Sequence, residues 1–322
     1  MKLLKKHGNS VFVHSLWRTA NTYFLGKFSG LDETMVFAEP FNYQLSIVDE
    51  SICAASEDDG VGLSAYRGLV DARSKIGGVG IQFYDIRYAL NFWFDHKDHG
   101  QLRYIQSLID YAADRDKAAV LGFVRSLGRL PLLREMSGVH IMLMRDPFDL
   151  FWSNYLKLRD EDTSFFALQY VMLATLCREV PALEALAMKH NLPKLKIKGA
   201  HDTFTEAYAQ MRSICSDNIE LLRESFILVY LLSYGAAMTH ADLVINVDRL
   251  SVDAAYQARL SELIADRTGH ELDFSDCACT RYAEPGPRME FYETYRAEQC
   301  TLEDSKQARW LSGGRLIDSL LA

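Results

Sequence analysis

Residues 11–25 of this 322-residue chain read Val-Phe-Val-His-Ser-Leu-Trp-Arg-Thr-Ala-Asn-Thr-Tyr-Phe-Leu. An apolar run typical of a buried strand passes into a polar loop, and the loop opens a segment that we expect to be helical. The N–H groups in the first turn of a helix lack intrahelical acceptors, and the helix dipole places partial positive charge there. Arg18 adds a full charge, and the side chains of Thr19, Asn21 and Thr22 add hydrogen-bond donors. This stretch therefore predicts an anion-binding loop between a strand and a helix.

A second junction of the same kind spans residues 139–155, which read Val-His-Ile-Met-Leu-Met-Arg-Asp-Pro-Phe-Asp-Leu-Phe-Trp-Ser-Asn-Tyr. The apolar run predicts a buried parallel strand, and Asp146 and Pro147 predict the N-cap and the first residue of a helix. Arg145 and Ser153 remain free to face a ligand, because aromatic residues occupy the buried face of that helix. These aromatic residues are Phe148, Phe151, Trp152 and Tyr155.

Together the two junctions resemble the sulfotransferases that use 3′-phosphoadenosine 5′-phosphosulfate (PAPS) as donor, in particular the bacterial and carbohydrate branches. Residues 18–23 resemble the phosphosulfate-binding loop of that family, with Ala20 at a position that is usually Gly. The loop is not a Walker A sequence, because the chain has no Gly-x-x-x-x-Gly-Lys-Ser/Thr. In the family, an Arg and a Ser spaced like Arg145 and Ser153 hold the 3′-phosphate of the donor. The donor-binding residues that the resemblance implies are Arg18, Thr19, Ala20, Asn21, Thr22, Tyr23, Arg145 and Ser153.

Sulfuryl transfer depends on charge stabilisation and alignment, because the bridging oxygen of the donor gains negative charge as its bond breaks. Arg18 is expected to neutralise that charge, and no metal ion is expected. The acceptor hydroxyl needs a general base. Glu39 is the first candidate, since its Phe-Ala-Glu-Pro context resembles the Glu-Pro element of carbohydrate sulfotransferases. A plain loop glutamate is the alternative, and His14, His96 and His99 are other possible bases. His14 lies within a predicted buried strand, which favours a structural role.

Arg125 and Arg129 follow another predicted strand, so they are expected near the crevice where open α/β sheets bind ligands. They are interpreted either as contacts to the donor or to an anionic acceptor, or as solvated charges. The chain lacks the Arg-Lys-Gly-x-x-Gly-Asp-Trp element with which cytosolic sulfotransferases close over adenine. The resemblance therefore points to a saccharide or glycolipid acceptor rather than to a small phenol.

The strand-like runs predict one α/β domain over residues 1–322, with a P-loop-like, mostly parallel central sheet flanked by helices. Segments 46–117 and 160–222 are predicted to be helical insertions on the acceptor side, and the glycines of Gly77-Gly78-Val79-Gly80 are interpreted as a turn. The most apolar stretch, 226–238, is too short to span a bilayer and predicts a buried helix. The predicted strands are 11–16, 35–38, 118–124, 139–144 and 242–247.

The composition is that of a globular protein, with 49% hydrophobic and 24% charged residues. A formal net charge of −8 argues against a general nucleic-acid binder, since phosphate backbones demand an excess of Lys and Arg. The six cysteines lack zinc-binding spacing and indicate reduced thiols in a cytoplasmic protein. Two rival functions remain, another P-loop-like nucleotide-dependent transferase such as a kinase, and a non-catalytic binding or scaffold relative. The sequence does not specify the oligomeric state.

Overall fold

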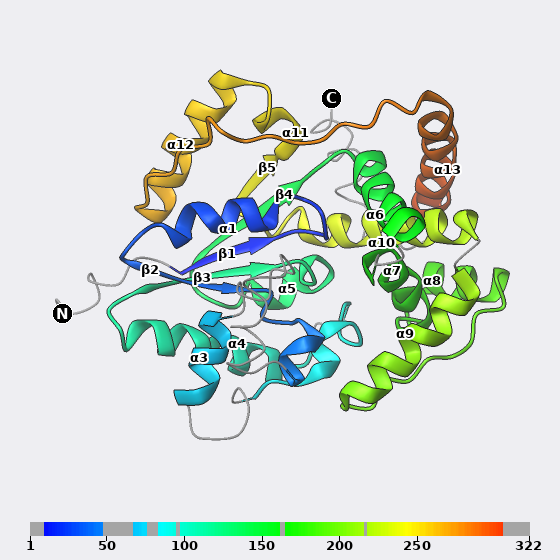
Figure 1. Ribbon diagram of the computed structural model, residues 1–322, viewed down its shortest axis with the longest axis horizontal. Coiled ribbons are helices and arrows are strands. Elements are labelled where there is room, and N and C mark those ends of the chain that lie inside the picture. Colours follow the sequence, from blue (N-terminus) through cyan, green and yellow to red (C-terminus); the bar gives the residue numbers. More distant parts are fainter. Residues whose placement is uncertain are drawn as a thin grey trace.

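The computed structural model describes residues 10–47, 67–75, 83–94, 97–161, 165–215 and 218–304. Its centre is a five-stranded, all-parallel sheet in the order β2-β3-β1-β4-β5 (Figure 1). The predicted α/β fold with a parallel sheet is confirmed, and the strands lie within a few residues of the predicted runs. The strands are β1 (Val11–His14), β2 (Thr34–Ala38), β3 (Ala118–Phe123), β4 (Val139–Met144) and β5 (Leu243–Asn246).

The three central strands, β1, β3 and β4, are buried along their whole length. Continuous apolar runs suit such positions, because helices cover both faces of a parallel sheet. In the register of the sheet, Val11 pairs with Val120 on one side and with Val139 on the other. The carboxyl ends of these three strands therefore meet at one edge, where ligands of open α/β sheets bind.

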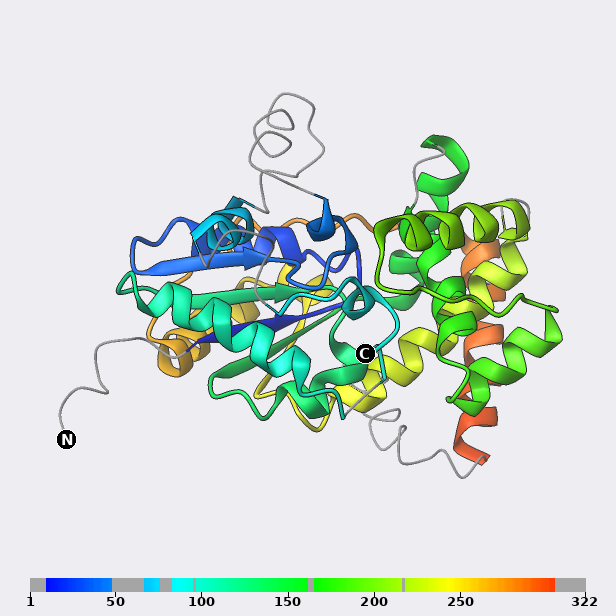
Figure 2. The ribbon, with the colours of Figure 1, turned by 90° about the horizontal axis from the view of Figure 1, so that it is seen from below.

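Helices cover the two faces of the sheet and form separate cores. On one face lie α1 (Asn21–Ser29) and α12 (Ala254–Thr268), and on the other α4 (Gly100–Ala113) runs along the sheet (Figure 2). Gly122 in β3 permits the close approach of α1, because a Cβ atom there would lie 2.2 Å from Leu25 Cδ1. The first turn of α1 is thus held close to the carboxyl ends of the central strands.

A group of helices packs beyond the carboxyl ends of the strands, on the right of the sheet in Figure 1. Its most deeply buried member is α10 (Ile219–Ala237). This helix contains the predicted buried stretch 226–238 except for residue 238. The other members of the group are α6 (Pro147–Glu161), α7 (Phe165–Leu176), α8 (Pro181–Lys189), α9 (His201–Cys215) and α13 (Pro285–Asp304). The remaining short elements are η1 (Tyr43–Ser46), α3 (Arg67–Lys75), η3 (Ile86–Ala89), η4 (Leu127–Arg129), α5 (Leu130–Leu133) and α11 (Val247–Leu250).

The predicted start of α6 is confirmed in detail. Pro147 is its first residue, and the Asp149 N–H donates to Asp146 Oδ1 over 3.0 Å, as an N-cap requires. Among the described helices, none combines the length and hydrophobicity needed to cross a bilayer. The predicted turn at Gly77–Gly80 lies outside the described residues.

Candidate functional site

The loop after β1 is held in place by its own side chains. The Asn21 amide donates to Ser15 Oγ over 2.9 Å and to the Phe123 carbonyl over 3.1 Å. The Thr19 hydroxyl donates to the Leu16 carbonyl over 2.9 Å. Thr19 and Asn21 are both buried. The Asn21 side chain fixes the loop against β3, whereas the Thr19 hydroxyl holds the loop to itself. These two side chains would therefore contribute to an anion site by holding the loop in shape.

The backbone of this loop has the form of an anion-binding nest. Arg18 and Ala20 have positive φ angles of 69° and 58°, and Ala20 is the N-cap of α1. A left-handed residue followed by a helical one directs successive N–H groups into one concavity. Ala20 makes no side-chain cap, and the first turn of α1 contains no acidic residue. Within this described first turn, the N–H groups and the positive end of the helix dipole thus have no acidic side chain beside them.

Two of the predicted loop residues lie on the outer side of the first turn. Thr22 is exposed. Tyr23 is half-buried, and its hydroxyl donates to Asp276 Oδ1 over 2.6 Å. Burial and the neighbouring Asp276 raise the pKa of this phenol far above its usual range. Tyr23 therefore fastens the segment after α12 to α1, a role that differs from the predicted contact with the donor.

The two junctions meet in space, although they lie far apart in the sequence. Arg18 Nε donates to Ser153 Oγ over 3.1 Å, and Arg145 donates to the Arg18 carbonyl over 3.1 Å. Arg18 is exposed, whereas Arg145 and Ser153 are buried. One hydroxyl and two guanidinium groups thus gather beside the N-terminus of α1. This arrangement suits a ligand with more than one phosphate-like group.

Residues from late in the chain hold Arg145 in place. The Arg145 Nε lies 3.5 Å from Asp248 Oδ1, and the Arg145 Nη2 donates to the Thr280 carbonyl. Asp248 also accepts the Asp146 N–H over 2.5 Å, and this fixes the backbone beside Arg145. No local sequence pattern links Asp248 to Arg145, because the two residues follow different strands, β5 and β4. Thr280 gave no sequence signal, because it contributes a backbone carbonyl.

Glu39 lies at the carboxyl end of β2, on the same edge of the sheet. It has a positive φ of 49°, and its N–H donates to the Gly122 carbonyl over 2.7 Å. Its carboxylate accepts from Arg125 over 2.5 Å and from the Asn42 amide over 2.7 Å. The Glu39 side chain is 22% exposed, so solvent or an acceptor can reach it. These contacts orient the carboxylate and leave part of it open.

The interpretation of Arg125 and Arg129 as solvated charges is wrong. Arg125 is 1% exposed and Arg129 is fully buried. Arg125 pairs with Glu39, and Arg129 donates to Gln101 Oε1 over 2.8 Å with its guanidinium above the Phe41 ring. Arg125 therefore belongs to the candidate site, whereas Arg129 braces the structure behind it.

The predicted structural role of His14 is confirmed. It lies fully buried in β1, with Nδ1 2.7 Å from Ser126 Oγ and Nε2 3.0 Å from His140 Nδ1. Burial, and then His140, hold the pKa of His14 well below its ordinary value. His99 is exposed, with its Nδ1 3.7 Å from Glu135 Oε2, and His96 lies outside the described residues. Among the described candidate bases, Glu39 combines a position at the carboxyl end of a strand with a partly exposed side chain.

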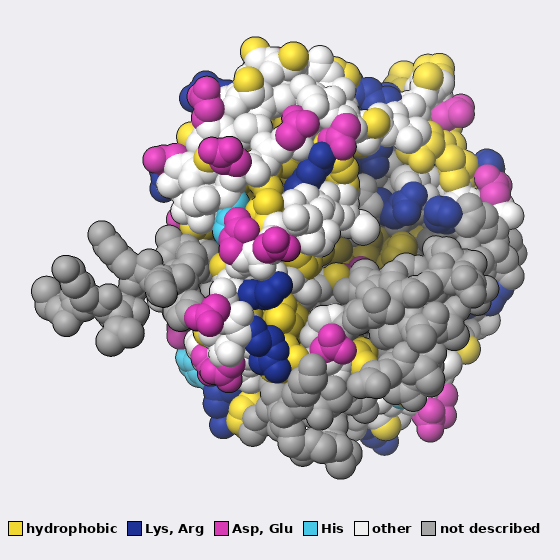
Figure 3. Space-filling model, turned by 60° about the vertical axis from the view of Figure 1, so that its left-hand side comes forward, with side chains coloured by type: hydrophobic (Ala, Val, Ile, Leu, Met, Phe, Trp, Pro, Cys, Tyr) yellow, Lys and Arg dark blue, Asp and Glu magenta, His cyan; other side chains and the backbone are white. Residues whose placement is uncertain are grey.

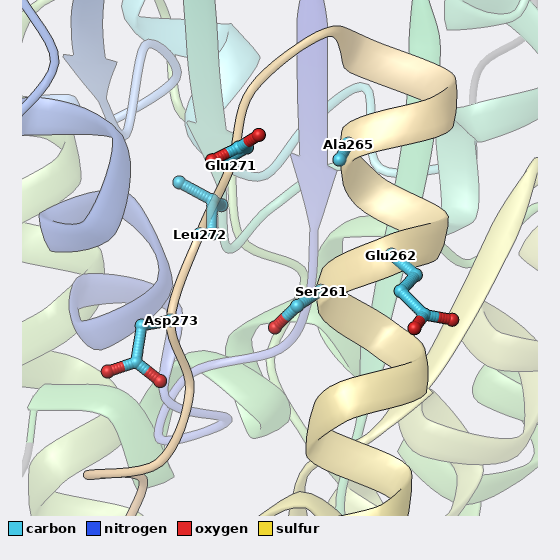
Figure 4. A pocket seen from close by; sticks show the side chains of 6 residues that line it. All are labelled: Ser261, Glu262, Ala265, Glu271, Leu272 and Asp273. Atoms are coloured by element: carbon cyan, nitrogen blue, oxygen red, sulfur yellow. The ribbon is translucent and has the colours of Figure 1, made fainter.

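Two recesses of different character can be distinguished on the surface that the described residues form. A hollow of about 520 Å³ lies between α12 and the segment after it (Figure 4), and its lining includes the carboxyl groups of Glu262, Glu271 and Asp273. These charges would repel a phosphosulfate, and none of the candidate residues lines this hollow. Figure 3 shows another recess with a hydrophobic floor and Lys and Arg side chains at its margin. Within the described residues, no group of three or more His, Cys, Asp or Glu could hold a metal ion.

Comparisons with protein-family models, with curated proteins and with solved structures found no match for this chain. A functional interpretation must therefore come from the residues and geometry of the site itself.

Proposed function

We propose that this chain is a sulfotransferase that moves a sulfuryl group from PAPS to a hydroxyl of a saccharide or glycolipid. The observation that carries the proposal is the meeting of Arg18, Arg145 and Ser153 beside the N-terminus of α1. The positive φ of Ala20 adds to it, because that conformation favours glycine, the residue that the resembled loop has there. A non-catalytic relative would more readily bury Arg18 against an acid, whereas Arg18 here is exposed and bonded to a hydroxyl.

In this proposal the first-turn N–H groups of α1 and Arg18 hold the 5′-phosphosulfate, and Arg145 and Ser153 hold the 3′-phosphate. Glu39 takes the proton of the acceptor hydroxyl while the acceptor oxygen forms its bond to sulfur. The bond between sulfur and the bridging oxygen breaks, and Arg18 neutralises the charge left on adenosine 3′,5′-bisphosphate. Arg125 acts as a positioning residue, since it holds the carboxylate of Glu39.

The test is calorimetric titration with adenosine 3′,5′-bisphosphate. Ser153→Ala removes one hydroxyl donor to a charged group, which corresponds to about tenfold weaker binding. Arg18→Gln is expected to weaken binding further, because it removes a full charge. Arg145→Ala is less informative, since it would leave Asp248 buried without its cation and disturb the fold.

The matched control is Ser261→Ala on α12, which should bind like the wild type. Absence of binding to the wild type would refute the sulfotransferase and favour the scaffold alternative. Equal affinities for wild type and Ser153→Ala would refute the assigned 3′-phosphate site. Confirmed binding would then justify a screen of acceptors with labelled PAPS.

A further inference from the structure

Four buried polar atoms in the residues around Arg125, the ion-pair partner of Glu39, have no hydrogen-bond partner among the described residues. They are Trp17 Nε1, Arg125 Nε, Gln169 Nε2 and the Tyr170 hydroxyl, and each of these residues is at most 1% exposed. Buried polar groups in proteins are rarely left unpaired, so such a group of atoms calls for an explanation. Three of the four can only donate, and the Tyr170 hydroxyl can donate or accept.

These atoms belong to one contiguous cluster, which we call the donor cluster. The Arg125 guanidinium lies 5.1 Å from the centre of the Trp17 ring and donates to Gln169 Oε1 over 3.3 Å. The Tyr170 ring meets the Trp17 ring edge-on at 5.1 Å. Arg125 also contacts Glu39, so the donor cluster adjoins the proposed base. A carboxylate, sulfate or phosphate group would complement it, because these groups offer only acceptor oxygens.

A second feature, which we call the lysine row, lies between α8 and α9. Lys194, Lys196 and Lys198 are exposed, whereas the alternating Leu195 and Ile197 are buried. This alternation points the three ammonium groups outward, and in an extended segment their positions lie roughly 7 Å apart. None of the three forms an ion pair with another described residue. In a chain of net charge −8, the lysine row is a local concentration of positive charge.

The lysine row leads toward the proposed active site. Three residues after Lys198, the His201 ring stacks with Tyr43 at a centroid distance of 5.7 Å. The Phe204 ring also stacks on the Tyr43 ring, nearly parallel to it, at a centroid distance of 4.2 Å. Tyr43 follows Glu39 by four residues in the chain, at the start of η1. The start of α9 thus connects the lysine row to the region around Glu39.

We propose that the acceptor is an acidic saccharide, with one anionic group bound at the donor cluster and further anionic groups along the lysine row. This inference rests on the proposed function and names its substrate class. The protein as a whole is negative, so an acidic acceptor gains attraction only from local groups such as these. A neutral saccharide has no charged oxygen to offer the four unpaired atoms of the donor cluster.

The first experiment compares oligogalacturonate with a neutral malto-oligosaccharide of equal length, by calorimetry with adenosine 3′,5′-bisphosphate present. The acidic probe should bind at least tenfold more tightly. Lys196→Gln with Lys198→Gln should weaken its binding about tenfold and flatten its salt dependence. The control pair, Arg259→Gln with Arg267→Gln on α12, removes the same charge elsewhere and should change neither.

The donor cluster is tested by Gln169→Glu, which keeps the side-chain shape but replaces a donor with a negative oxygen. Arg125 can still pair with the new carboxylate, so the melting temperature should confirm a folded protein. Affinity for oligogalacturonate should fall at least tenfold, and affinity for adenosine 3′,5′-bisphosphate should not change. Unchanged affinity for both probes would overturn the role of the cluster.

The outcomes separate this inference from the proposed function. Nucleotide binding with equal affinity for acidic and neutral probes overturns the inference and keeps the sulfotransferase. Charge-dependent binding of oligogalacturonate without nucleotide binding refutes the sulfotransferase and supports an acidic-saccharide site. Binding to phosphatidylserine vesicles that the lysine variant loses, with no oligosaccharide binding, overturns the inference in favour of a membrane surface.

Discussion

Ala20 occupies a backbone conformation that L-residues other than glycine rarely adopt, with φ 58° and ψ 25°. Glycine would remove this strain, although it also increases the entropy of the unfolded chain. We expect Ala20→Gly to raise the free energy of unfolding by up to about 1 kcal/mol, measured by urea denaturation. The control Ala258→Gly, inside α12, should lower it by about 1 kcal/mol. Equal destabilisation by both changes would contradict the strained conformation.

Glu39 gives the second prediction at this scale. If it takes the proton of the acceptor, Glu39→Gln should lower kcat about 10²–10⁴-fold. The fold should persist because the amide oxygen can still accept from Arg125 and Asn42, although the melting temperature should fall because Arg125 is buried without its anion. Glu262→Gln on α12 is the matched control, measured in the same PAPS-dependent assay. Retention of full turnover by Glu39→Gln would assign the proton transfer to another group.

Single residues also show what the sequence could and could not reveal. The proximity of Arg18, Arg145 and Ser153 was predictable, because the two strand-to-helix junctions that carry them meet at one edge of a parallel sheet. Gln169 was not, since it lies inside the apolar run of α7 and offers no periodic signal. The inward position of Arg125 depends on Glu39, which reaches it from another strand, and no local pattern encodes that pairing.

At the scale of elements, the buried chain Ser126–His14–His140 links the loop after β3 to β1 and β4. His140 Nε2 is 3.2 Å from the Met136 carbonyl, so it donates there and its Nδ1 accepts from His14. His14 Nδ1 is then the acceptor for the Ser126 hydroxyl. If both imidazoles are neutral, these contacts determine the position of every proton in the hydrogen-bonded row from Ser126 to Met136.

The histidine chain predicts a dependence of stability on pH. Burial lowers the pKa of His140 to about 4 and lowers that of His14 well below its ordinary value. The unfolded state thus binds more protons than the folded state below about pH 6.5, and stability falls as the pH falls. The expected slope approaches about 1.4 kcal/mol per pH unit for each histidine.

The measurement is the free energy of unfolding by urea between pH 7.5 and pH 5. His140→Gln should reduce the slope because it removes one titrating imidazole. The fold should survive because the amide can still donate to Met136 and accept from His14. His99→Gln, at an exposed site, is the control and should leave the slope unchanged. A wild-type stability that is flat over this interval would contradict buried neutral histidines.

Elements differed in how readily the sequence revealed them. The central strands were predictable because parallel strands that are buried on both faces are apolar throughout. The spacing of Tyr84, Tyr88 and Phe92 fits a helix as well as a packed loop. The structure forms only η3 and turns there, with Tyr88 in the core and its neighbours packed against it. An aromatic cluster can bury its rings without a regular helix, so the spacing of the rings alone does not determine the secondary structure of this segment.

At the scale of the whole molecule, α13 ties the end of the described chain to the start of α6. Arg288 donates to Asp146 over 3.1 Å and to Asp149 over 2.5 Å, and the Tyr292 hydroxyl donates to Asp146 over 2.8 Å. Burial raises the pKa of Asp149, which makes its charge dependent on partners such as Arg288. Arg145, the neighbour of Asp146, is thereby positioned from the far end of the sequence.

Loss of the contacts between α13 and α6 should affect both the stability of the fold and the proposed PAPS site around Arg145. We expect Arg288→Ala to lower the free energy of unfolding by about 1–3 kcal/mol, because Asp149 loses a buried charged partner. Affinity for adenosine 3′,5′-bisphosphate should also fall, as the backbone beside Arg145 loosens. Arg296→Ala, exposed on the same helix, should change stability by less than about 0.5 kcal/mol. Equal effects of the two changes would show that α13 does not brace the site.

The pairing of β1 with β3 and β4 also determines when a newly made chain can first complete the arrangement around the loop after β1. Both edges of β1 stay open until residues 118–144 have been synthesised, which takes on the order of 10 s after β1 itself. During that interval the ribosome-bound chain exposes an apolar strand and an unformed loop, a state that invites aggregation and chaperone binding. A chain terminated before Val139 would carry the complete loop sequence and still lack the arginine and serine that the loop meets.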